Sequence, residues 1–283
     1  GSWWQLARGQ LQYELNIDIP ADPVASSRVK LFTNLKEVSL LLPGRLAKTA
    51  EQERPLTISV ELDNTSLIPV KINYADRLQA ALVIDREQQQ LHSGALLFGT
   101  GKINFPEPGV VKLKINQVKL DLDSWLNIEA DSNSENSLFD YLNELDVATD
   151  QLIWQKNNLK SASLKFSKNK NLWQGVFTSQ FAAGRVSLPT TFSLASTINL
   201  DLDYIDLSSL SQINTDRNQD SDDFSQQAKF TINSKKLLWQ GSDLGVLQLQ
   251  TIAESNGARI KKFEINGSGY KLSLQGNWFN RKD

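Results

Sequence analysis

The 283-residue sequence contains no cysteine and only one histidine. Without cysteine the chain can form no disulfide, no thiolate metal site and no cysteine nucleophile. A catalytic triad or a zinc site would have to rely on His92, which lies in a polar segment typical of a turn. We therefore predict that the protein is not an enzyme and that it needs no metal ion or other cofactor.

The chain also lacks an excess of charge of either sign. Thirty Lys and Arg residues against 32 Asp and Glu residues give a formal net charge of -2. A general nucleic-acid-binding protein would normally carry a basic excess, so we expect no nucleic-acid partner. Long apolar runs are absent too: no stretch of about 18 apolar residues could form a membrane-spanning helix.

Helix signals are scarce. Residues 137–146 place apolar side chains at the spacing of one helix face, and residues 45–53 are a weaker candidate between two turn signals. The polar residues 211–227 contain almost no apolar side chain and predict a mobile loop. One or two short helices are therefore expected.

Alternation of apolar and polar residues dominates the sequence instead. Between Leu11 and Ile19 every odd position is apolar and every even position is polar. Strict alternation indicates strands with one dry and one wet face, as in antiparallel sheets. Roughly fifteen such strands would make an open sheet on the order of 70 Å long, which must curl, split or close. We predict a mainly β fold: a long, strongly twisted antiparallel sheet curled into an open, taco-like groove.

Two short phrases occur twice. Residues 118–125 (VKLDLDSW) return eighty positions later as residues 198–205 (INLDLDYI), and residues 152–155 (LIWQ) return as residues 237–240 (LLWQ). Such recurrence indicates a repeated β unit. The apolar positions also change from odd to even numbers at Asn116–Gln117, which predicts a bulge or bend there.

We predict that the apolar side chains of the alternating strands line the groove. The aspartates between them, in the pairs Asp121/Asp123 and Asp201/Asp203, are expected on the solvated outer face rather than in a metal or acid–base site. The predicted groove-lining residues are Ile58, Val60, Leu82, Ile84, Leu113, Ile115, Val118, Leu120, Leu122, Ile198, Leu200, Leu202, Phe230 and Ile232. Gly1 and Ser2 are expected to be a remnant of cloning, residues 3–130 a first groove segment and residues 131–283 a second one continuous with it.

Several phrases resemble the AsmA-like family. They are residues 33–43 (TNLKEVSLLLP), residues 46–48 (LAK) and 54–56 (RPL), residues 106–109 (PEPG) leading to LDLDSWL, and residues 274–278 (LQGNW). The resemblance extends over nearly the whole chain. The sequence departs from the family pattern at Glu37, where a glycine is usual.

The resemblance implies the periplasmic region of an inner-membrane-anchored, bridge-like protein. Such proteins form long β grooves proposed to carry phospholipids between the inner and outer membranes. Phospholipid, both membranes (reached through other parts of the chain) and envelope proteins are thus the expected partners. An apolar track suits acyl chains, because each buried methylene contributes about 0.8 kcal/mol. The alternative is a closed β-sandwich that serves as a binding or scaffold module for a glycan or a protein.

Overall fold

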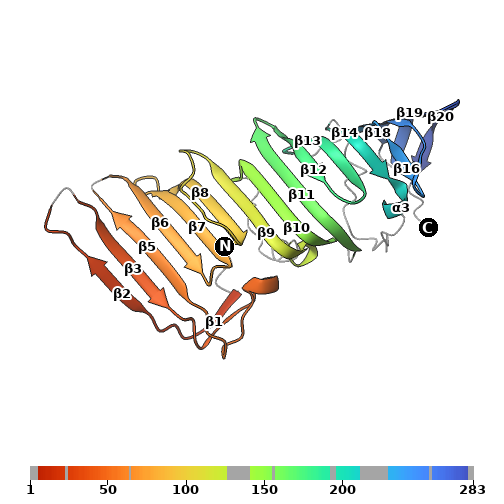
Figure 1. Ribbon diagram of the computed structural model, residues 1–283. Helices are drawn as coiled ribbons and strands as arrows, with labels where there is room; N and C mark the ends of the chain where they lie inside the picture. Colours follow the sequence, from red (N-terminus) through yellow and green to blue (C-terminus); the bar gives the residue numbers. More distant parts are fainter. Residues whose placement is uncertain are drawn as a thin grey trace. The chain divides into compact units, whose positions relative to one another are not determined.

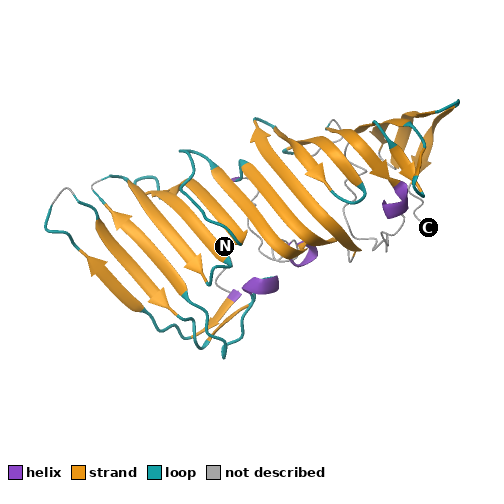
Figure 2. Cartoon of the chain, viewed as in Figure 1, coloured by secondary structure: helices purple, strands orange, loops and turns teal. Residues whose placement is uncertain are grey.

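The computed structural model describes residues 6–22, 25–63, 65–125, 141–154, 157–191, 196–210, 229–254 and 257–279. The chain divides into two compact units, Gly1–Trp154 (unit 1) and Gln155–Asp283 (unit 2). Strands make up most of both units, which confirms the mainly β prediction (Figures 1 and 2). No described helix is long and apolar enough to cross a membrane. The segment boundary predicted after residue 130 lies outside the described residues.

Unit 1 is built on one sheet. Its strands are β1 (Ala7–Gly9), β2 (Glu14–Asp18), β3 (Ser27–Thr33), β4 (Val38–Leu40), β5 (Leu56–Leu62), β6 (Leu67–Tyr74), β7 (Leu78–Asp85), β8 (Gln90–Gly99), β9 (Val111–Asp121) and β10 (Glu144–Trp154). Strands β2, β3 and β5 to β8 pair antiparallel in chain order, and β9 and β10 continue the sheet. Strands β1 and β4 form a separate antiparallel pair.

Unit 2 repeats this arrangement with its own strands. They are β11 (Asn157–Asn169), β12 (Leu172–Thr178), β13 (Ala182–Pro189), β14 (Thr197–Asp206), β15 (Lys229–Ser234), β16 (Leu237–Trp239), β17 (Ser242–Asp243), β18 (Val246–Glu254), β19 (Gly257–Gly267) and β20 (Tyr270–Phe279). Among the described residues β2 pairs only with β3, and β20 only with β19. The sheets are therefore open, and the alternative of a closed β module is wrong.

Most strand pairs are antiparallel, as predicted, but the sheet is mixed, because β8–β9, β9–β10, β14–β15 and β14–β16 are parallel. A parallel pair needs a connection that crosses one face of the sheet. After β8, Gly101 accepts a hydrogen bond from Gln79 Nε2 at 3.1 Å, and the Phe105 ring centroid lies 5.0 Å from Lys71 Nζ. Gln79 and Lys71 project from the polar face, so residues 100–110 cross that face and leave the apolar one open.

Both helix predictions need correction. In the weaker candidate, residues 45–53, only the 3-10 helix η2 (Gly44–Leu46) forms, because Lys48 already pairs with Leu40 as a β-bridge. In the candidate at residues 137–146, residues 137–140 lie outside the described part, Tyr141 is helical, and the chain is strand β10 from Glu144 onward. The short α-helix α3 (Leu207–Leu210) was not predicted. The predicted loop at residues 211–227 lies outside the described residues.

The structure places the internal repeat at a different offset. Leu120 pairs with Leu152, and Ile205 pairs with Leu237. Ile205 follows Leu120 by 85 positions, and Leu237 follows Leu152 by the same 85 positions rather than by eighty. This offset aligns residues 120–124 (LDLDS) with residues 205–209 (IDLSS). In each copy a strand ends, a helical turn follows, and the chain returns as a parallel strand. The repeated unit is thus a parallel crossover.

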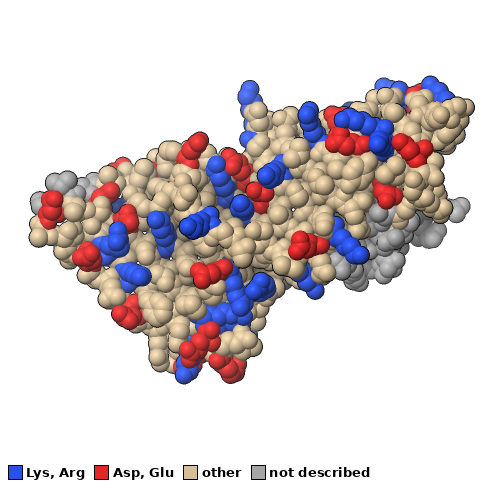
Figure 3. Space-filling model, viewed as in Figure 1, with Lys and Arg blue, Asp and Glu red and all other residues tan. Residues whose placement is uncertain are grey.

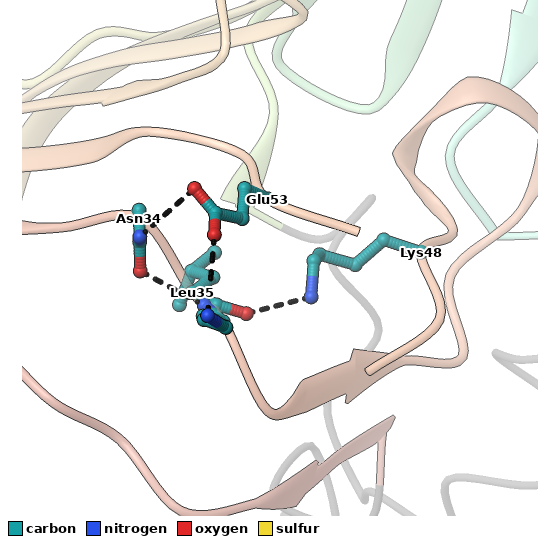
Figure 4. A network of polar contacts seen from close by, with 5 residues as sticks. Asn34, Leu35, Lys48 and Glu53 are labelled. Carbon is teal, nitrogen blue, oxygen red and sulfur yellow. Dashed lines mark hydrogen bonds and ion pairs between the residues drawn. The ribbon is translucent and has the colours of Figure 1, made fainter. Parts of the chain in front are cut away.

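A small cap closes one end of the unit 1 sheet. Leu35, Val38 and Leu46 pack on Tyr74 to form a buried cluster. Lys48, only 4% exposed, reaches under the turn between β3 and β4 and donates to the carbonyls of Leu35, at 2.7 Å, and Val38. Figure 4 shows Lys48 directed at this turn, with Asn34 and Glu53 bonded beside it. The cap comprises residues 33–56, which include three of the phrases that carry the family resemblance.

The cap explains why a glycine is usual where this chain has Glu37. Glu37 has a φ of 65°, a left-handed conformation that costs a residue with a Cβ atom roughly 1–2 kcal/mol. We expect Glu37→Gly to raise the free energy of unfolding by about 1 kcal/mol. The relief of backbone strain exceeds the cost of the larger conformational entropy that glycine gives the unfolded chain. Urea denaturation measures this change. Glu37→Ala keeps the strain, and an equal gain from that variant would contradict the explanation.

Candidate lipid-binding surface

The strand register places apolar side chains side by side across unit 1. Residues that face each other on neighbouring strands project from the same face of a sheet. One unbroken row of such partners consists of Leu15, Leu31, Ile58, Ile72, Ala80, Leu96, Leu113 and Leu145. A second row consists of Ile17, Val29, Val60, Val70, Leu82, Gly94 and Val111. We call this surface the apolar face of unit 1.

Unit 2 has an apolar face of the same kind. Its first row consists of Phe166, Gly175, Val186, Leu200, Ile232, Leu249, Phe263 and Leu274. Its second row consists of Leu164, Phe177, Gly184, Leu202, Ser234, Leu247, Ile265 and Leu272. The intervening row on the opposite face includes Lys165, Arg185, Asp201, Asn233 and Glu264, so that face is polar.

Among the described residues, each apolar face is covered at one end only. In unit 1 the cap and Trp125 cover the row that contains Leu78 and Phe98, and the rings of Trp125 and Phe98 meet edge to face at 5.1 Å. In unit 2 residues of α3 and β16 cover the row around Leu202. Elsewhere most side chains of the faces are half-buried, the burial expected of neighbours in a sheet without a second layer.

The outermost strands expose their apolar residues more strongly. Leu15 and Ile17 in β2 are 48% and 59% exposed, and Leu272 and Leu274 in β20 are both 50% exposed. A contiguous exposed apolar surface of this kind marks an interaction site in a water-soluble fold. The aliphatic and aromatic side chains of this surface are suited to contact with apolar matter.

Most of the predicted lining residues lie on these faces. In unit 1 the following predicted lining residues are half-buried: Ile58, Val60, Leu82, Ile84, Leu113 and Ile115. In unit 2 Ile198 pairs with Phe230 and Leu200 pairs with Ile232, which puts all four on one face with Leu202. Ile198 and Leu202 are buried, whereas Leu200, Phe230 and Ile232 are half-buried.

The prediction for residues 118–122 is wrong in its facing. Val118 is 65% exposed, whereas Leu120 is 5% exposed, so the two do not share an environment. Burial changes from odd to even positions across Val118, two residues after the predicted bend. On the neighbouring strand β10, the Thr149 hydroxyl donates to the carbonyls of Val118 and Gln151. These hydrogen bonds mark a local irregularity in the pairing of β9 with β10. Leu122 lies in the helical turn of residues 122–125 and not in a strand.

Sequence reasoning missed several members of the apolar faces. Leu31, Ile72 and Leu96 lie in the middle of the first row of unit 1, and Val186 and Phe263 in that of unit 2. Ile72, Val186 and Phe263 alternate with polar neighbours, which is the signal that could have identified them. Leu96 lies between Ala95 and Leu97 and carries no such signal. Ala80 and Gly175 carry no such signal, because only the register shows that small residues continue the rows.

A hollow of about 710 Å³ lies on the polar side of unit 2. Asp201 and Asp203 line it and are exposed, as predicted. Asp201 accepts a hydrogen bond from Asn233 Nδ2 at 3.0 Å, and Lys235 Nζ lies 2.7 Å from an oxygen of Asp203. The hydrogen bond and charge of Lys235 lower the pKa of the Asp203 carboxyl. No group of three acidic or histidine side chains in the described ranges is placed to hold a metal ion.

In the first copy of the repeat, Asp121 caps the helical turn that follows β9. Its carboxylate accepts the backbone N–H of Ser124 at 3.1 Å, and in the equivalent position Asp206 accepts that of Ser208 at 2.9 Å. We expect Asp121→Ala to lower the free energy of unfolding by about 1 kcal/mol. Asp121→Ser should be nearly neutral because serine also caps a helix. Equal losses in urea denaturation would show that capping is not the role of this carboxylate.

An open sheet with one apolar and one polar face defines a class of β proteins that expose an apolar surface. Comparison with known families identifies the member: residues 2–283 match the family described as YhdP protein. The chain therefore belongs to the YhdP family, which confirms the resemblance to AsmA-like proteins. Membership suggests a role in lipid transport in the cell envelope. No curated protein and no solved structure matches the chain.

Proposed function

We propose that this chain is a periplasmic segment of an inner-membrane-anchored protein that carries phospholipids between the inner and outer membranes. Acyl chains would lie on the apolar faces, and headgroups would remain in water at the strand ends. The function is binding and conduction rather than catalysis. Both membranes and envelope proteins are its proposed partners.

The unbroken apolar rows support this proposal most strongly. Eight strands at about 4.8 Å spacing give the first row of unit 1 a length of about 34 Å, similar to the about 30 Å hydrocarbon core of a bilayer. An acyl chain on such a row gains about 0.8 kcal/mol for each methylene removed from water. Because the row is uniform and lacks a deep pocket, a chain can slide along it without crossing a large barrier.

Site-specific photo-crosslinking in the full-length protein tests the proposal. A photoreactive residue at Ile72 or Leu200, both half-buried on an apolar face, should form adducts with phospholipid. The same residue at the adjacent positions Lys71 and Asp201 projects from the polar face and should form few. Mass spectrometry of the purified adducts identifies the lipid. Equal adduct yields from the two faces, or none from either, would refute lipid conduction on this surface.

A further inference from the structure

Three arginines gather at the capped end of unit 1. Arg54 Nη1 donates to the carbonyl of Arg45 at 2.9 Å and to that of Leu46 at 3.3 Å. Arg77 Nη1 donates to the same Arg45 carbonyl at 2.6 Å. One oxygen atom thus brings the guanidinium groups of Arg54 and Arg77 next to each other. Figure 3 shows Lys and Arg side chains gathered over this end of unit 1.

The charge of this cluster is not balanced within the described part of the chain. The ion pairs formed there use other cations, and none joins a carboxylate to Arg45, Arg54 or Arg77. Burial, with the charges of Arg54 and Arg45, holds the pKa of the Arg77 guanidinium below its ordinary value. Three neighbouring cations without a counter-ion repel one another, and a bound anion would remove that repulsion.

The cluster adjoins the apolar face. Arg54 Nη1 lies 3.1 Å from the Tyr74 hydroxyl, which itself donates to the Leu46 carbonyl at 3.0 Å. Tyr74 pairs with Leu56 on one side and Leu78 on the other, so its ring belongs to the apolar side of the sheet. Cations therefore stand at the strand ends, beside the apolar row that contains Tyr74, Leu78 and Phe98. An anionic amphiphile needs this arrangement of charge beside apolar surface.

We propose that Arg45, Arg54 and Arg77 bind the phosphodiester of a lipid headgroup whose acyl chains lie on the apolar face of unit 1. The planar guanidinium group matches phosphate oxygens with two parallel hydrogen bonds. Arg45 is exposed, and its guanidinium makes no hydrogen bond to any other described residue, so its donors are available. Arg54 and Arg77 supply charge while they hold η2 in place. This inference rests on the proposed function and extends it to the headgroup.

Short-chain lipids test the site on the purified chain. Dihexanoyl phosphatidylglycerol, dihexanoylglycerol and inorganic phosphate are titrated by calorimetry at low and physiological ionic strength. Arg45→Gln should weaken binding of the phosphatidylglycerol about tenfold, because one charge-assisted hydrogen bond is lost. The affinity for dihexanoylglycerol, which has no phosphate, should not change. The melting temperature of the Arg45→Gln variant should be unchanged. The matched control is Arg28→Gln, which removes an exposed arginine paired with Glu61 on the polar face.

The outcomes separate the possibilities. Unchanged phosphatidylglycerol binding by Arg45→Gln, or equal weakening by Arg28→Gln, overturns the site. Inorganic phosphate that binds as tightly as the lipid would overturn the assignment to a headgroup and leave a free-phosphate site. Photo-crosslinking at Ile72 depends on acyl chains alone. Retained crosslinks together with an unaffected Arg45→Gln variant would therefore overturn only this inference, whereas loss of the crosslinks would overturn the proposed function.

Discussion

Ile72→Asp is expected to abolish lipid transport by the full-length protein while the amount of folded protein stays close to normal. Ile72 lies in the middle of the first row of unit 1, between Ile58 and Ala80. It is half-buried, so a carboxylate there can still reach water when no lipid is bound. An acyl chain that passes over it must strip that water, at a cost of several kcal/mol. That cost exceeds the about 0.8 kcal/mol gained from each methylene.

The measurement is outer-membrane barrier function in cells that depend on the variant alone, with protein amount followed by immunoblotting. The matched control is Lys71→Asp, which introduces the same side chain one residue earlier on the opposite face. Ile58→Asp and Ser59→Asp form an equivalent pair in β5. Equal loss of function from both members of a pair, at equal protein amount, would contradict transport along the apolar face.

Alternation in the sequence was enough to predict the faces of most strands. Leu113 and Ile115 lie where their odd numbering puts them, because a regular strand turns successive side chains to opposite faces. The bend predicted at Asn116–Gln117 failed, because alternation continues to the exposed Val118 and burial changes parity only after it. The irregularity there depends on both strands, and Thr149 is 31 positions away. The local sequence pattern therefore predicts which face of the sheet a side chain occupies only where the strand pairing is regular.

The parallel crossovers could not be predicted from alternation. An apolar row looks the same in sequence whether its neighbour runs parallel or antiparallel, since both put paired residues on one face. The repeat did contain the information: Ile205 and Leu237 are each 85 positions after Leu120 and Leu152. The stronger match of the Leu-Asp-Leu-Asp letters at eighty positions obscured it. The aspartates of the two Leu-Asp-Leu-Asp phrases have different roles, because Asp121 caps a turn and Asp201 accepts a hydrogen bond from an asparagine.

The cap lies beyond sequence reasoning for a different physical reason. Its stability depends on a lysine, a residue type that is rarely buried, inside a turn of left-handed residues. Nothing in the letters of residues 33–56 shows that Lys48 turns inward while Lys36 stays in water. The arginine cluster was missed as well, because Arg45, Arg54 and Arg77 come from three separate segments. The family resemblance marked this region as important without giving the cause.

Lys48→Met should destabilise unit 1 by about 3 kcal/mol. Methionine fills a similar volume, but it removes the donor that serves the buried carbonyls of Leu35 and Val38. An unsatisfied buried acceptor costs about 1–3 kcal/mol, and a bond from a charged donor falls at the upper end. Urea denaturation followed by tryptophan fluorescence measures the loss. Lys36→Met is the control, because Lys36 is exposed and only forms an ion pair with Glu53 at 3.7 Å; its effect should stay within about 0.5 kcal/mol.

The pH dependence gives an independent check on Lys48. Burial, followed by the charge of Arg54, lowers the pKa of its ammonium group in the folded protein. Because the folded state releases this proton at a lower pH than the unfolded state, alkaline conditions relieve the penalty of burying the charge. The stability of the wild type relative to Lys48→Met should therefore rise as the pH increases through the lowered pKa toward the ordinary value for lysine. A difference that shrinks over this range, or a Lys48→Met variant as stable as the wild type, would show that the cap does not depend on a buried lysine.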